Sequence, residues 1–384
     1  MYGKRILFFD PDTKTCKAAA RALTATRSDV DFATNLEGMT TLLAAGTYDL
    51  IMAARDLEAP AKMLDLFDRI KAESPSTLFV MHATESTQDY MPVLLERPYL
   101  RNLIAKNEDP LEPEELIVTA EKLLRNDIFG LNKYLRWGVE PLSITLRESQ
   151  RKADYVRQVT DYASRLGCNS RTVELVNGIA DELVTNAIFN APVDASGKAK
   201  YRHHKRSESL ILDEDEAATL EFACDGDFMA VSISDPFGSL KQDTVIEYLN
   251  RCLVKGPKQI SEDSGGAGLG LYRVFQSVSK FVINLEPGVR TEVISLVDLR
   301  LSMKQFRLAT KSFHGTACSR GPPLRSRVRA CAGPLLARRQ ASMTRRTRCG
   351  QQDPYRRESS QESRATRPPC QLASASAVSR LRHP

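Results

Sequence analysis

The sequence predicts an α/β domain with a doubly wound, five-stranded parallel sheet, then an α+β sandwich, then a disordered C-terminal tail. Three observations carry this prediction. Short apolar runs alternate with helical patterns in the first 125 residues. Helical patterns precede and separate the strand patterns of residues 141–311. Periodicity stops near residue 314. We therefore divide the chain into a domain at 1–125, a linker at 126–140, a domain at 141–311 and a tail at 312–384.

The first domain contains apolar runs that are each long enough for one buried strand. They are Arg5–Phe9, Val30–Ala33, Asp49–Ala53, Thr77–Met81 and Asn102–Ala105. Helical patterns such as Thr13–Thr24 lie between the runs, and a last helix is predicted at Pro113–Leu124. Proline suits the first turn of that helix because no backbone N–H is needed there. This alternation predicts a parallel sheet that is covered on both faces.

The second domain has a different order of elements. We predict helices at Ile144–Leu166, Arg171–Asn190, Gln242–Leu253 and Leu269–Ser279, and strands at Ala218–Ala223, Phe228–Ser234, Phe281–Glu286 and Thr291–Leu299. A polar, basic insertion follows the second helix. The linker before this domain holds the only tryptophan, Trp137, and we expect its side chain to pack against its surroundings.

The net charge of +6 is unevenly distributed. Residues 312–384 contain fifteen Arg, no Lys and three acidic residues, a charge of +12, so the preceding 311 residues carry −6. The predicted folded part thus has no basic footprint, so we do not expect it to bind nucleic acid. No apolar run approaches the roughly 18–20 residues that span a bilayer. The first residues, MYGKRILFFDPD, do not resemble a secretory signal, so we expect a cytoplasmic protein without a membrane partner.

The Arg-rich tail cannot bury enough apolar area to offset the entropy of ordering it. Its many arginines without a single lysine are typical of a GC-rich reading frame translated after a frameshift or read-through. We interpret the tail in that way. A native disordered tail and a nucleic-acid-binding arm are the alternatives.

Three motifs in the second domain point to a nucleotide site. In DELVTNAIFNA, Glu182 and Asn186 are four residues apart and share one helix face. A carboxylate there can act as a general base, and an amide oxygen can bind Mg²⁺. In VSISDPFGSL, Asp235 ends a strand and can accept a hydrogen bond from an exocyclic amine, while Gly238 permits close backbone approach. In DSGGAGLGLYRV, glycines precede a helix whose N-terminus can cradle phosphates: Gly265, Gly266, Gly268 and Gly270.

Each motif alone is common, but their order and surrounding elements resemble the GHKL ATPase superfamily. This superfamily includes the ATP-binding domains of histidine kinases and the anti-sigma-factor serine kinases. Glu182 and Asn186 match its N box, Asp235 and Gly238 its first glycine box, and Gly266, Gly268 and Gly270 its second. Thr291 matches the threonine that supports the adenine-binding aspartate. The resemblance implies Mg-ATP held beneath a mobile lid at Lys255–Ser264.

Two departures from the family concern turnover more than binding. Leu240 stands where the first glycine box has a second glycine. Phe189 and Asn190 stand where a basic residue often follows the N-box asparagine. The chain also lacks a histidine on a long helix before the ATPase domain, so histidine autophosphorylation is not expected.

The first 125 residues resemble the receiver domain of response regulators. Asp10 and Asp12 match its acidic Mg²⁺ pair, and Lys106 matches its lysine. Ala54 occupies the place of the phosphorylated aspartate, and alanine has no oxygen that can attack a phosphoryl donor. His82 replaces the switch Ser or Thr, and Asp56 is a weak substitute acceptor. The resemblance implies a degenerate receiver used for protein contact.

Taken together, the motifs indicate a bacterial-type signalling protein that binds Mg-ATP and phosphorylates a partner, such as an anti-anti-sigma-like regulator, on Ser or Thr. Glu182 would be the catalytic base. The competing interpretation is an ATP-binding regulatory module without phosphotransfer, and an enzyme that only hydrolyses ATP is a third. A homodimer is left open.

Overall fold

The computed structural model describes residues 3–55, 60–107, 111–201, 204–206, 208–255 and 269–318. Among the helices of these residues, none is long and apolar enough to cross a membrane. Contacts divide the chain after Leu324, and all the described residues belong to the first of the two units. The Arg-rich tail beyond Cys318, for which we predicted disorder, lies outside the described residues.

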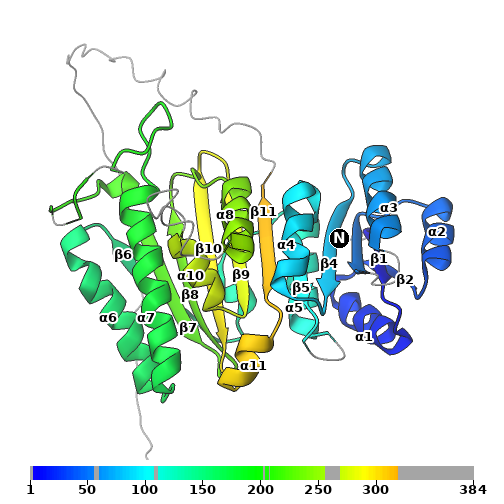
Figure 1. Cartoon of the computed structure of the whole chain (residues 1–384), viewed down its shortest axis with the longest axis horizontal. Coiled ribbons are helices and arrows are strands. Elements are labelled where there is room, and N and C mark those ends of the chain that lie inside the picture. Colours follow the sequence, from blue (N-terminus) through cyan, green and yellow to red (C-terminus); the bar gives the residue numbers. More distant parts are fainter. Residues whose placement is uncertain are drawn as a thin grey trace, which may run out of the picture. The chain divides into compact units, whose positions relative to one another are not determined.

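The first 125 residues form the predicted five-stranded parallel sheet, with strand order β2-β1-β3-β4-β5 (Figure 1). Its strands are β1 (Arg5–Phe9), β2 (Asp29–Ala33), β3 (Leu50–Ala54), β4 (Leu78–Ala83) and β5 (Asn102–Ala105). Its helices are α1 (Thr13–Leu23), α2 (Leu36–Ala45), α3 (Pro60–Glu73), α4 (Thr87–Glu96) and α5 (Pro113–Arg125). The doubly wound class predicted for this region is therefore confirmed.

Local sequence signals explain several of these boundaries. Asp12 caps α1 by accepting hydrogen bonds from the backbone of Lys14 and Thr15, which satisfies N–H groups that have no helical partner. Helix α5 begins at Pro113, as predicted, and ends at Asn126 in the left-handed conformation with φ of 52°. Strands β1, β3, β4 and β5 are mostly buried and read as continuous apolar runs, whereas the edge strand β2 is partly exposed.

The second domain is an α+β region with antiparallel strands, which confirms the predicted class. Its strands are β6 (Leu142–Leu146), β7 (Ala218–Cys224), β8 (Phe228–Asp235), β9 (Lys280–Glu286) and β10 (Arg290–Asp298), in the order β9-β10-β8-β7-β6. Its helices are α6 (Lys152–Arg165), α7 (Ser170–Thr185), α8 (Gln242–Lys255), α10 (Leu269–Gln276) and α11 (Met303–Leu308). Short 3₁₀ turns occur at 24–26, 98–100, 131–134, 149–151 and 214–216.

The antiparallel sheet of this domain has two buried faces of different construction. Helices α6, α7, α8 and α10 pack on one face and contribute to a large apolar core that includes Ile179, Leu183 and Phe275. The linker covers the other face, where Leu131 and Leu135 pack against strand residues such as Ile294.

Two predictions around the linker are wrong. The segment from Ile144, predicted to be helical, begins as strand β6, because pairing with β7 satisfies its backbone hydrogen bonds. Leu142, Ile144 and Leu146 alternate with polar residues, which is the pattern of a strand, and the helix begins only at Lys152. Trp137 does not pack against its surroundings: its relative exposure is 101%.

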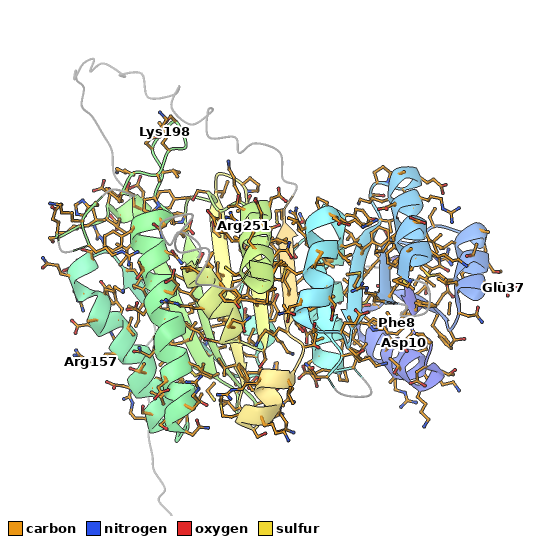
Figure 2. The ribbon with its side chains drawn as sticks, in the orientation of Figure 1. Phe8, Asp10, Glu37, Arg157, Lys198 and Arg251 are labelled. Carbon is orange, nitrogen blue, oxygen red and sulfur yellow. The ribbon has the colours of Figure 1, made fainter. Side chains whose placement is uncertain are left out.

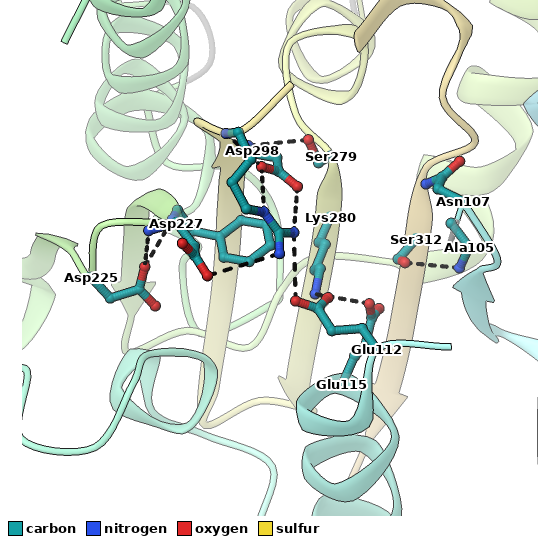
Figure 3. A network of polar contacts seen from close by, with 12 residues as sticks. Ala105, Asn107, Glu112, Glu115, Asp225, Asp227, Ser279, Lys280, Asp298 and Ser312 are labelled. Carbon is teal, nitrogen blue, oxygen red and sulfur yellow. Dashed lines mark hydrogen bonds and ion pairs between the residues drawn. The ribbon is translucent and has the colours of Figure 1, made fainter. Parts of the chain in front are cut away.

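The predicted start of the tail at residue 312 is also wrong. Ser312–Ala317 forms strand β11, which pairs in parallel with β9 and antiparallel with β5. This strand joins both domains into one sheet of eleven described strands. Phe313 is fully buried, and the Ser312 hydroxyl accepts a hydrogen bond from the Ala105 backbone at 3.0 Å (Figure 3). The sequence of this segment shows no clear strand pattern, because the strand is stabilised by pairing with β5 and β9.

Helix α5 adds buried polar contacts to the same joint. Lys280 of β9 forms ion pairs with Glu112 and, at 2.9 Å, with Glu115 (Figure 3). The buried imidazole of His314 lies 2.9 Å from the Glu115 carboxylate. Burial alone would raise the pKa of Glu115, but the Lys280 ammonium and the hydrogen bond with His314 outweigh it and hold that pKa at about 2. Each charge at this buried joint therefore has a partner.

Candidate functional site

Glu182, Asn186 and Asn190 form a hydrogen-bonded ladder at the C-terminal end of α7. The Asn186 amide donates to the Glu182 carboxylate at 2.9 Å, and the Asn190 amide donates to the Asn186 oxygen at 2.6 Å. Residues Asn186–Asn190 continue the helix as one π-helical turn. Such turns are rare and frequently lie at functional sites. Both Glu182 and Asn186 are half-buried, so a ligand can reach them.

Gly270, in the first turn of α10, packs directly against the Glu182 carboxylate. A Cβ atom added to Gly270 would overlap both carboxylate oxygens, so only glycine fits without a shift of Glu182. The structure therefore brings two predicted site residues together from segments almost ninety positions apart in the sequence. Gly265, Gly266 and Gly268 lie outside the described residues, as does all of the predicted lid after Lys255.

Asp235 is the last residue of β8 and lies opposite Thr291 of β10 in the strand register. Its carboxylate accepts a hydrogen bond from the Phe237 backbone at 3.0 Å, and only 8% of the residue is exposed. Burial disfavours the charged form and raises the pKa of Asp235 to about 6. Thr291 and Asp235 are cross-strand neighbours.

Gly238 shapes the loop that follows Asp235. Its φ of +56° favours glycine, and an added Cβ would overlap the Glu286 carbonyl oxygen in the β9–β10 turn. Its own carbonyl accepts a hydrogen bond from the Gly288 backbone at 3.1 Å. The next residue, Ser239, donates from its hydroxyl to the Ala191 carbonyl at 2.9 Å. A hydrogen bond thus connects the Asp235 loop to Ala191, the residue that follows the π-helical turn.

These contacts place the described parts of the three motifs around one group of packed elements. Helix α7 packs against β8, β10 and α10, and the π-helical turn packs against β8. No group of three or more His, Cys, Asp or Glu side chains that could hold a metal occurs in the described ranges. A Mg²⁺ ion at Asn186 would therefore depend on ligands other than such a cluster, and Mg²⁺ commonly uses phosphate oxygens and water.

An open cavity of about 570 Å³ lies elsewhere, beside the linker. Its lining includes Arg136 and Trp137 of the linker, Glu221 of β7 and Arg290 of β10. Sequence reasoning missed this cavity, because its walls come from four separate stretches of irregular and strand structure. It contains none of the predicted site residues.

The receiver-like acidic residues are fully engaged by groups of the protein. The Asp10 carboxylate, labelled in Figure 2, accepts from the Asp12 backbone at 2.8 Å and from the Lys106 ammonium at 3.0 Å. The Asp12 carboxylate caps α1. Ala54 ends β3 beside His82 of β4, and Asp56 lies outside the described residues. The pocket therefore holds the ammonium group of Lys106 beside the Asp10 carboxylate. Ala54 offers no oxygen that could accept a phosphoryl group.

His82 of β4 places a buried aromatic ring beside Asp10. The ring stacks on Phe8 at 5.1 Å, and its Nε2 lies 3.1 Å from the Phe9 carbonyl. Burial lowers the pKa of His82 to about 4, so the ring is neutral at pH 7. A carbonyl only accepts hydrogen bonds, so Nε2 carries the proton and Nδ1 faces Asp10 at 3.6 Å.

Comparisons with known proteins extend to about a third of the chain. No protein-family model and no curated protein matches the sequence. An orphan response regulator of H. pylori is 21% identical, with 32% of this chain and 98% of that chain covered and a TM-score of 0.28. A response regulator from Thermotoga maritima is 20% identical over 32% of this chain and 98% of that one, also at 0.28.

A two-component response regulator from Clostridium difficile is 20% identical, with 33% of this chain and 100% of that chain covered and a TM-score of 0.29. The fold itself is established by the strand order and by the helices that alternate with the strands. An all-parallel sheet in the order β2-β1-β3-β4-β5 is the doubly wound arrangement of receiver proteins. The first 125 residues of this chain have that receiver fold.

Proposed function

We propose that residues 141–311 bind Mg-ATP and transfer its terminal phosphoryl group to a Ser or Thr of a partner signalling protein. In this proposal the receiver fold cannot be phosphorylated at residue 54 and regulates the second domain through direct contact. The observation that carries the proposal is Asp235, a carboxylate that is buried at a strand end beside the N-box helix.

A buried carboxylate without a cation is unfavourable, which is why the pKa of Asp235 rises to about 6. Such a group is a candidate functional residue, because a structural role alone would be met by a neutral side chain. The exocyclic amine of adenine is a donor of the right kind. Thr291 opposite Asp235 and the close turn at Gly238 support the same assignment.

The catalytic part of the proposal rests on Glu182. Its carboxylate is oriented by the Asn186 amide and lies against Gly270, at the start of the helix that follows the glycine-rich segment. Phosphates bound at that helix N-terminus would lie close to Glu182. Glu182 would accept the proton of the partner's hydroxyl while Asn186 contributes an oxygen to Mg²⁺.

The regulatory part rests on contacts between α4 of the receiver fold and α8. Arg101 forms an ion pair with Asp243 of α8. The Gln242 amide, at the start of α8, donates to the carbonyls of Ile283 in β9 and Thr316 in β11 at 3.3 and 3.1 Å. Because α8 leads directly into the predicted lid, a partner that displaces α4 would change the position of the lid.

ATP binding without phosphotransfer is the second candidate function. The observation that favours it is the Asn190 amide, which occupies the Asn186 oxygen predicted to bind Mg²⁺. If this hydrogen bond persists in the bound state, nucleotide can still contact Asp235 while the metal lacks its protein ligand.

Calorimetric titration with ATP tests the nucleotide site. We expect tight binding by the wild-type chain with Mg²⁺, and at least about tenfold weaker binding when the metal is omitted or Asn186 is replaced by Ala. Asp161→Asn, at an exposed position on α6, is the control and should bind normally. Equal, metal-independent binding by wild type and Asn186→Ala would refute the assigned ligand.

Radiolabelled ATP separates the two candidate functions. Incubation with candidate partners should label a partner Ser or Thr, and Glu182→Gln should lose about two to four orders of magnitude in transfer rate while still binding ATP. Binding without label on any partner would favour the regulatory module.

A further inference from the structure

Strand β6 is the last strand at one end of the described sheet, and β2 is the last at the other (Figure 1). β6 pairs with β7 along one side, and no strand of the described ranges pairs with its other side. Three of its five residues are exposed: Leu142, Ser143 and Thr145. Unpaired backbone groups on such an edge are a template for another strand.

The two edge strands differ in their protection against pairing. β2 carries two carboxylates, Asp29 and Asp31, and Arg5 forms an ion pair with Asp31 at 2.8 Å. Charges on an edge strand discourage association with other strands. β6, with the sequence LSITL, has no charged residue, proline or glycine. The chain therefore protects one end of its sheet and leaves the other end suitable for pairing.

We propose that β6 is a homodimerisation edge that pairs antiparallel with β6 of a second copy of this chain. The sequence LSITL has the same residue types when read in either direction. A two-fold axis at Ile144 would place Leu142 opposite Leu146 and Ser143 opposite Thr145. Apolar side chains then face apolar ones and hydroxyls face hydroxyls, which are favourable cross-strand pairs. A two-fold interface requires such self-complementarity.

Exposed apolar side chains flank both ends of this strand. Trp137 and Leu142, with relative exposures of 101% and 50%, lie at or before its N-terminal end. Ile211, 66% exposed, bridges Glu148 just beyond its C-terminal end. Antiparallel pairing brings the start of one β6 toward the end of the other, so these side chains of the two copies approach one another. Large aromatic residues are enriched in such interfaces.

The palindromic pattern also decides between occupants of the edge. An unrelated extended peptide would use the same backbone groups, but it would not require matching residue types on the two sides of Ile144. The dimer would form one continuous sheet across both copies. The site around Glu182 is built from other elements, so its function and dimerisation can fail independently.

Sedimentation velocity of the full chain over about a hundredfold range of concentration tests the dimer. Wild type should shift from monomer to dimer. Replacing Ser143→Lys together with Thr145→Lys places lysines opposite each other across the axis and should raise the dissociation constant at least about tenfold. Gln158→Lys with Ser164→Lys adds the same charge at exposed α6 positions and should leave the dimer intact.

A charge exchange identifies the register. The pair Ser143→Glu with Thr145→Glu should also be monomeric, and mixing it with the double lysine variant should restore a dimer, because opposite charges then face each other. Thermal melts establish that each variant is folded. A wild type that stays monomeric, a double lysine variant that still dimerises, or a mixture that stays monomeric each overturns the proposal.

Discussion

The receiver fold and the second domain each bury an aspartate at the end of a strand, but they treat it differently. Asp10, 2% exposed, lies 3.0 Å from the Lys106 ammonium. Asp235, 8% exposed, accepts a backbone hydrogen bond and has a pKa raised to about 6 by burial. Because the Lys106 ammonium balances the charge of Asp10, the first pocket does not need a bound cation. The second carboxylate retains an unfavourable charge, and for this reason it is the one that we propose as a ligand-binding group.

Removing the internal cation should produce the largest effect. Lys106→Met leaves Asp10 as a buried carboxylate without its cation, and we expect the free energy of unfolding to fall by about 3 kcal/mol. Urea titration followed by circular dichroism measures this change. Lys17→Met, at an exposed position on α1, is the control and should change stability little. If Lys106→Met were as stable as Lys17→Met, Lys106 would not be needed to stabilise the buried Asp10 carboxylate.

Removing the charge of the second aspartate should affect binding instead. Asp235→Asn replaces one acceptor oxygen with a donor amide, which would face the adenine amine in the proposed site. We expect ATP affinity to fall about a hundredfold, equivalent to about 2.7 kcal/mol, in calorimetric titration. The fold should persist, because the side-chain oxygen can still accept from Phe237. Unchanged affinity would show that this carboxylate does not contact nucleotide.

The fit between the two helices of the second site can be tested at one glycine. Gly270→Ala inserts a methyl group against the Glu182 carboxylate, which must move and lose its hydrogen bond with Asn186, and we expect a loss of about 1–2 kcal/mol in stability. Gly178→Ala on α7 is the matched control, because nothing lies within 4 Å of the added Cβ and alanine favours helix. Thermal unfolding compares the two. A harmless Gly270→Ala would mean that α10 is not seated on Glu182.

The smallest effect concerns pH. The folded-state pKa of Asp235 is raised from 3.8 to about 6, so the stabilisation from its protonation is complete below about pH 4 and disappears as pH rises through about 6. At pH 7 the charge therefore destabilises the unliganded fold. At pH 7 the free energy of unfolding of Asp235→Asn should exceed that of the wild type by about 1–2 kcal/mol. This difference should shrink toward pH 4. A gain independent of pH would contradict the assigned cause.

Much of the first domain was predictable, because its order depends on signals close together in the chain. Five apolar runs marked its strands, and Pro113 marked the start of α5. The candidate site was predictable only as separate motifs. The spacing of Glu182 and Asn186 predicts that they share one helix face, and the hydrogen bond between their side chains shows that they do.

The sequence alone determined the classes of both domains and the glycine, amide and carboxylate groups available to the second one. Only the tertiary structure decided that Gly270 lies on Glu182, that Leu142–Leu146 is a strand and that Ser312–Ala317 joins the two sheets. The physical reason is the same in each case. Short segments with ambiguous periodicity are stabilised by hydrogen bonds and packing from residues far away in the chain, and local propensity does not record such partners.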